Sequence, residues 1–384
     1  MTAQIKLKHS GGNGVIIEAP ASNPASDKTI TLPSDETGVF ATKNSANNLQ
    51  NVTGINGGQL GNRNLLINGD MTISQRNGGN SVAVTQGTVT LDRWKVVNDA
   101  GASSKFNVQQ VDDAPVGLKK SLKMTSSSAY TVPATEVYGV GQKIEGFNMN
   151  QLMFGSSNAK TITISFWVKS SLTGTFSGSV LNQDMFRGYP YTYTINAANT
   201  WEYKTVTIAG SQNGTWGVGD GTGMQIFWNM GSGASRSDTA GQWSTTQYSF
   251  GANGATSVVG TNGATLQITG CQVEEGSIAT TFEHRPYSVE LALCQRYYEI
   301  AQGEWYGPVY GTDSTMRFSV PFKVKKRSDP TLTAISTDEN CCSSVSVVGA
   351  NFDSTLGARV QGNNVFLDGA NRHFSAKFSA NSEL

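Results

Sequence analysis

Charge is scarce in this sequence of 384 residues: only 15% are charged, and 28 basic residues balance 28 acidic ones. A chain with no basic stripe is a poor partner for nucleic acid. Its apolar runs are too short to span a membrane, and the opening MTAQIKLKHSGGNG has no apolar core of a secretory signal. We therefore expect a soluble protein with no nucleic-acid partner, no membrane insertion and no export by the usual route.

Residues for metal or nucleophilic chemistry are also few. The three histidines, His9, His284 and His373, lie in separate segments, so neither a His-rich metal site nor a catalytic triad has an obvious set of parts. The four cysteines include no CxxC pair, and a disulfide between the adjacent Cys341 and Cys342 would be strained. Buried free thiols and no cofactor are the expectation.

Glycine is abundant, with 43 residues, and Ser, Thr and Asn are frequent beside it. Between residues 63 and 286 they separate short strands of period two, such as Thr161–Lys169 and Met224–Met230. In Thr265–Glu274 the alternation changes parity at Gly270, where we expect a β-bulge. About eight or more such strands, with no helical periodicity between them, predict a jelly-roll β-sandwich.

Residues 1–62 have almost no aromatic side chains. Two short strand candidates, Gly14–Glu18 and Thr29–Leu32, stand among turn-rich sequence. A segment this small has too little apolar area to offset the entropy lost on ordering, so it is either disordered or packed against other copies of itself. We take the second as the working inference and expect a β-hairpin within an intertwined oligomerisation segment.

Residues 299–384 predict a small C-terminal β-sandwich, which makes the whole chain all-β. Apolar residues alternate from Met316 to Val324, and Pro321 within that run suits an edge strand because proline cannot donate to the ladder. Further strands are expected at Val345–Val347, at Val360 and at Phe374–Phe378, with Asp368–Gly369 as a turn.

The stretch QVEEGSIATTFEHRPYSVELALCQRYYE, residues 272–299, raises the question of an active site. Its catalytic candidates are Glu274, Glu275, Glu283 and His284. Paired carboxylates about 5–9 Å apart hydrolyse glycosides. The alternative, which is the commoner outcome for such clusters, is that Glu274 ends a strand, Glu283 and His284 flank a turn, and Arg285 pairs locally.

The end of this stretch carries a helical pattern. The stripe consists of Val289, Ala292, Leu293, Arg296 and Tyr297. Ser288 is the expected N-cap, and the charges are expected on the solvated face. We therefore favour a strand, a turn and a linking helix (287–298) that form a hinge between two modules rather than an active site.

Aromatic side chains offer a better binding candidate. Those in Gly/Ser/Thr-rich stretches, expected to be loops, are Trp216, Trp243, Tyr189, Tyr191 and Tyr193, with Arg187 beside them. Planar rings next to polar groups are the parts needed to stack on sugars, while the alternative is that they form core or intersubunit contacts. A calcium ion shared by Asp70 and Glu274 is a weaker prediction, because oxygen ligands suffice for it.

Several of these segments together resemble a phage tail-fibre family. NLLINGDMTISQR (Asn64–Arg76), LDRWKV (Leu91–Val96) and IEG (Ile144–Gly146), followed by SFWVKSS and the 272–299 stretch, are similar to the carbohydrate-binding-module-like jelly roll of tail fibres and prophage structural proteins. KLKHSGGNGVIIEAPASNPASDKTITLPSDETG is similar to the virion-proximal start of marine and cyanobacterial phage fibres, and HFSAKFSANSEL to the end of fibre tips. The resemblance covers most of the chain.

This resemblance implies a homotrimeric, non-enzymatic protein of the virion tail, assembled in the host cytoplasm, that attaches to host surface polysaccharide. It implies that residues 1–62 bind other tail or baseplate proteins and trimerise, that 63–286 form the jelly roll and that 299–384 form the tip. The alternative is a purely structural tail or baseplate adaptor without receptor binding. A glycan depolymerase is a third, less favoured function.

Overall fold

The computed structural model describes residues 61–98, 104–308, 315–339, 342–350, 353–363 and 371–384, together with four short strands within the first 50 residues. The chain divides into two units, Met1–Val52 and Thr53–Leu384. In the first, β1 (Gln4–Lys8) pairs antiparallel with β2 (Gly14–Glu18), and β3 (Thr42–Lys43) with β4 (Leu49–Gln50). The predicted strand at Gly14–Glu18 is therefore confirmed, while Thr29–Leu32 lies outside the described residues.

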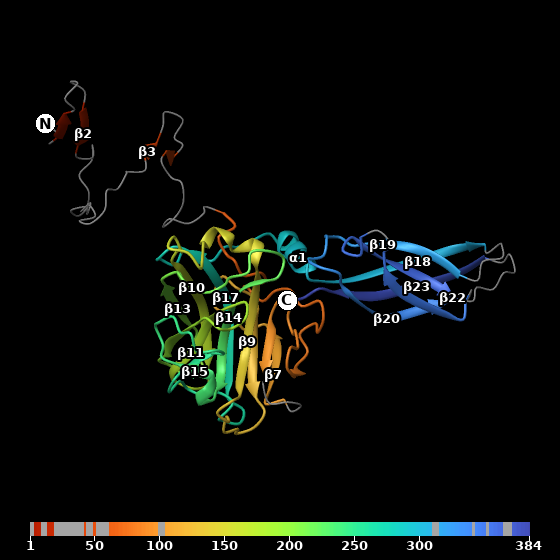
Figure 1. The fold of residues 1–384 in the computed structure, drawn as a ribbon, viewed down its shortest axis with the longest axis horizontal. Coiled ribbons are helices and arrows are strands. Elements are labelled where there is room, and N and C mark those ends of the chain that lie inside the picture. Colours follow the sequence, from red (N-terminus) through yellow and green to blue (C-terminus); the bar gives the residue numbers. More distant parts are fainter. Residues whose placement is uncertain are drawn as a thin grey trace. The chain divides into compact units, whose positions relative to one another are not determined.

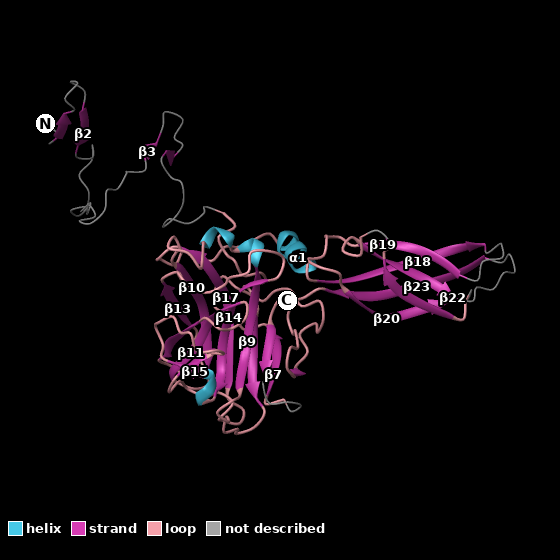
Figure 2. Ribbon diagram, in the orientation of Figure 1, coloured by secondary structure: helices cyan, strands magenta, loops and turns pink. Residues whose placement is uncertain are grey.

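The second unit contains a jelly-roll sandwich of two antiparallel sheets (Figures 1 and 2). One sheet contains β5 (Val82–Ala83), β7 (Phe106–Val111), β8 (Ser121–Ser126), β10 (Ile162–Ser170), β13 (Glu202–Ile208) and β17 (Thr265–Glu275). Its six strands follow the order β13-β10-β17-β8-β7-β5. The other contains β6 (Lys95–Asn98), β9 (Val137–Glu145), β11 (Gly174–Asn182), β12 (Gly188–Ile195) and β14 (Thr222–Ser232). Its five strands follow the order β12-β11-β14-β9-β6.

The sandwich core follows from the alternation in the strands. The alternating apolar residues of β10 are fully buried, as are Met224 and Trp228 of β14; those of β10 are Ile162, Ile164, Phe166 and Val168. In β17 the register against β10 shifts opposite Phe166, and Gly270 there has a φ of +59°. The predicted bulge is confirmed, and it keeps apolar side chains facing the core on both sides of the glycine.

Short elements complete the sandwich. They are the 3-10 turns η1 (Gly146–Asn148), η2 (Asn150–Leu152) and η3 (Ala234–Arg236), and the parallel strands β15 (Ser237–Asp238) and β16 (Gly251–Ala252).

The helix α1 (Tyr287–Gln295) follows the sandwich, but two predictions about it are wrong. Pro286 occupies the N-cap position, and Ser288 lies inside the helix without capping it. The buried side is formed by Glu290, Cys294 and Gln295, whereas Val289 is 45% exposed. A carboxylate thus lies on the face where the pattern predicted an apolar residue, because Glu290 is paired there with other buried groups.

The C-terminal part is the predicted small β-sandwich, and it consists of two three-stranded sheets. One contains β18 (Tyr298–Pro308), β20 (Thr331–Glu339) and β23 (Asn371–Asn381), with β23 in the middle. The other contains β19 (Thr315–Pro321), β21 (Ser344–Gly349) and β22 (Gly357–Asn363), with β22 in the middle. Pro321 ends an edge strand, and the aromatic rings of β23 are buried between the sheets. The turn expected at Asp368–Gly369 lies outside the described residues.

Two further observations bear on the sequence predictions. Cys271 and Cys294 are free and buried, as expected; Cys342 is buried, and Cys341 lies outside the described residues. Within the described part of the chain, no helix is both long enough and apolar enough to cross a membrane.

Candidate functional site

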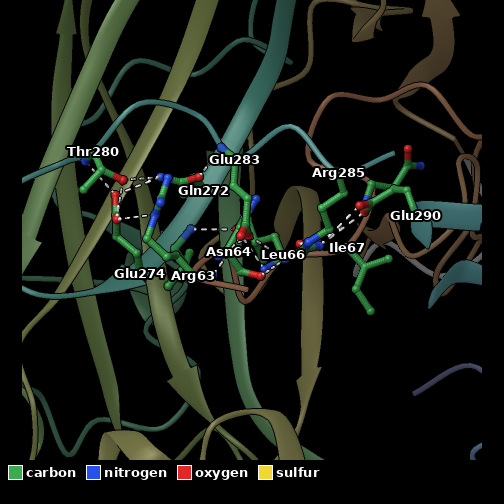
Figure 3. Close-up of polar contacts among 12 residues, drawn as sticks. Arg63, Asn64, Leu66, Ile67, Gln272, Glu274, Thr280, Glu283, Arg285 and Glu290 are labelled. Carbon is green, nitrogen blue, oxygen red and sulfur yellow. Dashed lines mark hydrogen bonds and ion pairs between the residues drawn. The ribbon is translucent and has the colours of Figure 1, made fainter. Parts of the chain in front are cut away.

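The first candidate is the carboxylate cluster of the 272–299 stretch (Figure 3). Glu274 is the penultimate residue of β17 and is 1% exposed. It accepts hydrogen bonds from the Thr280 N–H at 2.8 Å, the Thr280 hydroxyl at 2.6 Å and the Gln272 amide at 2.9 Å, and the Arg63 Nε lies 3.8 Å away. These bonds fold residues 276–282 back onto the end of the strand, so Glu274 has a structural role.

Glu283 is likewise committed to the backbone. It accepts the N–H groups of Arg63 at 3.2 Å and Asn64 at 2.9 Å, and the Arg285 guanidinium lies 3.2 Å away. Burial opposes its ionisation, but the Asn64 N–H, the charge of Arg285 and the Arg63 N–H outweigh burial and lower the pKa of Glu283. A glycosidase acid needs the opposite shift, so this carboxylate is poorly suited to that role.

Arg285 connects this carboxylate to the helix. Its guanidinium donates to the carbonyl oxygens of Leu66 and Asn64 and pairs with Glu290 at 3.3 Å. Glu290 also accepts the Asn68 N–H, and burial is the main reason that its pKa is raised. The cluster therefore fastens the first residues of the sandwich to its last strand and to α1, and the structural interpretation of Glu283 and Arg285 is confirmed.

The remaining members of the stretch do not add to an active site. His284 is exposed, and its ring meets the edge of Phe282 at 5.0 Å between centroids. Glu275 pairs with Lys160 at 3.5 Å.

The predicted calcium site is not formed by these contacts. Asp70 accepts hydrogen bonds from the Thr72 N–H and hydroxyl, and Glu274 is occupied by Thr280, Gln272 and Arg63. Among the residues that the structure describes, no group of three or more His, Cys, Asp or Glu side chains could hold a metal ion.

The aromatic candidates fall into two groups. Tyr191 and Tyr193 lie on strand β12, not on a loop, and are 1% and 6% exposed. The Tyr191 hydroxyl donates to the Phe227 carbonyl at 3.0 Å, deep in the sandwich. These two rings are core residues, which corrects the prediction that they face a ligand. The alternation along β12 places both on its buried face, although the Tyr/Thr-rich sequence was interpreted as a loop.

Trp216, Trp243 and Tyr189 do come together. Trp216 and Trp243 meet edge to face at 5.7 Å, Tyr189 meets Trp243 at 5.2 Å, and Phe154 contacts both indoles, at 4.8 and 5.9 Å. The Arg187 guanidinium lies 5.8 Å from the Trp243 ring centre. Phe154 was missed by the sequence analysis, since nothing in its own stretch, LMFGSSN, links it to loops far along the chain.

Only part of this cluster reaches solvent. Trp216 is 7% exposed, and its indole N–H donates to the Asn213 carbonyl, so it forms the base of the cluster. Tyr189, Trp243 and Arg187 are partly exposed, with the Trp243 N–H bonded to the Ala209 carbonyl at 2.7 Å and the Arg187 Nε to the Ser211 hydroxyl at 3.1 Å. These bonds hold the Trp243 and Arg187 side chains in place and leave part of each side chain exposed to solvent.

A second aromatic pair lies on the outer face of the six-stranded sheet. Trp167 and Tyr203 are cross-strand partners with centroids 5.3 Å apart and planes tilted by 51°. Trp201 is nearby in sequence, and its indole N–H donates to Asp113 at 3.2 Å. In the alternation of Thr161–Lys169, Trp167 falls on the face opposite the buried Phe166 and Val168.

Comparison with known proteins gives only distant similarities. No protein-family model matches the sequence, and no curated protein matches it significantly. Similar solved structures include the enzymatically active domain of bacteriophage CBA120 tailspike protein 4, with 13% identity over 50% of this chain and 21% of that chain and a TM-score of 0.29.

Carbohydrate-binding modules are also among the similar structures. TmCBM61 in complex with beta-1,4-galactotriose is 10% identical over 56% of this chain and 99% of that chain, with a TM-score of 0.28. The family 11 carbohydrate-binding module from Clostridium thermocellum, in complex with a mixed-linked tetrasaccharide, is 13% identical over 55% and 100%, with a TM-score of 0.26. Similarities this slight carry no argument about function.

Proposed function

We propose that this chain is a carbohydrate-binding attachment protein of the phage tail-fibre class, non-enzymatic and homotrimeric. The observation that carries the proposal is the partly exposed group of Tyr189, Trp243 and Arg187. The buried Trp216 packs edge to face against Trp243. A fixed aromatic ring beside a guanidinium supplies a stacking surface and hydrogen-bond donors at little entropic cost on binding.

The tail-fibre assignment rests on the sequence resemblance. In this proposal residues 1–62 trimerise and attach to other tail or baseplate proteins, the protein is part of the virion tail after assembly in the host cytoplasm, and the β domains face host surface polysaccharide. Saturable adsorption of labelled full-length protein to a panel of candidate host cells tests the attachment function. Its mass in solution tests the trimer.

The variant Trp243→Ala tests the site itself. A central aromatic contact is typically worth about 2 kcal/mol, so affinity for the adsorbing cells should fall about thirtyfold. Trp201→Ala, which removes an indole just before β13 of the six-stranded sheet, is the matched control and should bind within about twofold of the wild type. Equal binding by all three proteins, with unchanged melting temperatures, would exclude this site.

The structural adaptor is the second candidate, because one observation favours it. Tyr191, Tyr193 and Trp216 are buried, so half of the predicted binding residues serve packing. A trimer that adsorbs to no cell and no polysaccharide would favour the adaptor over the attachment protein.

A further inference from the structure

A different set of polar side chains lies on the C-terminal sheet formed by β18, β23 and β20. Phe374, Ala376 and Phe378 of β23 face the core between the two C-terminal sheets. Ser375 and Lys377 therefore point to the opposite, outer face, since successive residues of a strand alternate.

The strand register places further groups on this outer face. On β18, Gln302 lies opposite Lys377, Glu304 opposite Ser375 and Tyr306 opposite His373. On β20, Ser336 lies opposite Lys377 and Asp338 opposite Ser375. The result is one continuous polar surface across three strands, with Tyr306 near one end.

The surface is hollowed. A groove of about 320 Å³ runs over Gly303 and Ala376, with walls formed by Gln302, Glu304, Ser336, Ser375 and Lys377. Ligand pockets in proteins begin at about 300 Å³, so the groove is large enough for a small ligand. Gly303 faces inward, where a Cβ would meet Phe318 and Val320, so only its backbone lies beneath the groove.

The polar side chains that line the groove are available to bind a ligand. Within the described part of the chain, the side chains of these five residues have no hydrogen-bond or ion-pair partner. The contrast with Glu274 and Glu283 is clear, because every oxygen of those carboxylates is used internally. Tyr306 is 67% exposed, which leaves its ring free to stack on a ligand.

We infer that this groove is a saccharide-binding site on the tip, in which Tyr306 stacks on a sugar ring at one end of the groove. This inference rests on the proposed attachment function and adds a second site to it. Sugar hydroxyls both donate and accept hydrogen bonds, and the wall offers donors in Lys377 and Gln302 and acceptors in Glu304 and Gln302. Glu304 and Lys377, the two charged groups of the groove wall, balance each other, and Asp338 farther along the face lies 3.4 Å from His373, which favours a neutral glycan.

The experiment uses full-length protein and immobilised bacterial lipopolysaccharides and capsular polysaccharides with neutral repeating units. Tyr306→Ala and Lys377→Ala should each weaken binding at least tenfold on the polysaccharide that binds the wild type. Tyr287→Ala removes a tyrosine of similar exposure, 63%, from α1, and Lys325→Ala removes a lysine whose side chain is 60% exposed. Both controls should bind within twofold of the wild type.

The outcomes separate the two proposals. Loss of binding in the groove variants, with controls and melting temperatures unchanged, supports the inference. Retained binding by Tyr306→Ala and Lys377→Ala overturns it while leaving the attachment function in place. A wild-type protein that binds neither the polysaccharides nor any cell overturns the attachment function, and this inference with it.

Discussion

Lys143, on β9, carries a charge that the fold disfavours. Burial lowers its pKa from 10.5 to about 8, and the positive charges of Lys95, Arg327 and Arg93 act in the same direction. Between pH 8 and 10.5 the unfolded chain therefore holds a proton that the folded chain has released. Stability rises with pH wherever the unfolded state binds more protons.

Replacing this lysine should remove that part of the pH dependence. We expect the free energy of unfolding of the wild type to increase relative to Lys143→Met as the pH rises from 8 to 10.5. Below pH 8 the variant should be the more stable of the two, since it lacks the partly buried positive charge of Lys143. Urea unfolding at pH 7, 8.5 and 10 measures the difference, and a constant gap across this range would contradict the assigned pKa.

At the scale of elements, β17 depends on its bulge. Gly270 has a left-handed backbone, which costs an ordinary residue about 1–2 kcal/mol. A Cβ there would also lie 2.8 Å from the Leu118 Cδ1 and 3.2 Å from the Trp167 Cδ1. Gly78, at a φ of +54°, has open space around it and is the matched control.

Gly270→Ala should therefore destabilise the sandwich more than Gly78→Ala does. Both variants are destabilised by the left-handed backbone. Only Gly270→Ala also brings a Cβ too close to its neighbours, which lowers its free energy of unfolding by about a further 1 kcal/mol. Thermal or urea unfolding of the two variants beside the wild type checks the expectation. Equal destabilisation would mean that Leu118 and Trp167 move aside freely.

The elements also explain which sequence predictions succeeded. Period-two patterns and Gly270 carry information within one strand, so β10, β14 and the bulge of β17 were predictable. Glu290 was placed wrongly because its burial depends on Arg285 and Asn68, and no local pattern records that pairing.

For the aromatic cluster, the sequence indicated the residues but not the contacts between them, because those contacts are also non-local. Trp216 and Trp243 could be chosen for their type and their polar context. Their contact with each other and with Phe154 depends on three separate segments meeting, which the sheet order decides and local periodicity does not specify. The same periodicity, applied to Tyr189–Tyr193 as a strand, would have put Tyr191 inside.

At the scale of the whole molecule, buried polar groups join the sandwich to the C-terminal sheets. Glu145 of β9 is 1% exposed and accepts hydrogen bonds from Arg296 at 2.9 and 2.5 Å and from the Tyr297 hydroxyl at 2.6 Å. The Gln75 amide donates to the Tyr298 carbonyl at 2.9 Å. The linking segment was expected to be a hinge, but these contacts give it fixed partners on the sandwich.

Removing Arg296 should uncouple the two parts. Breaking a fully buried ion pair from one side costs about 3–5 kcal/mol, and because 30% of the Arg296 side chain is exposed we expect a smaller loss of stability, about 2–3 kcal/mol. Calorimetry should then resolve the single unfolding transition expected of the wild type into two for Arg296→Met.

Adding Glu145→Gln to that variant should restore part of the stability, since no unpaired buried charge remains. Lys325→Met breaks an exposed pair with Asp353 and should change stability by at most about 0.5 kcal/mol. A single, unshifted transition in Arg296→Met would show that the sandwich and the tip are held together by other contacts.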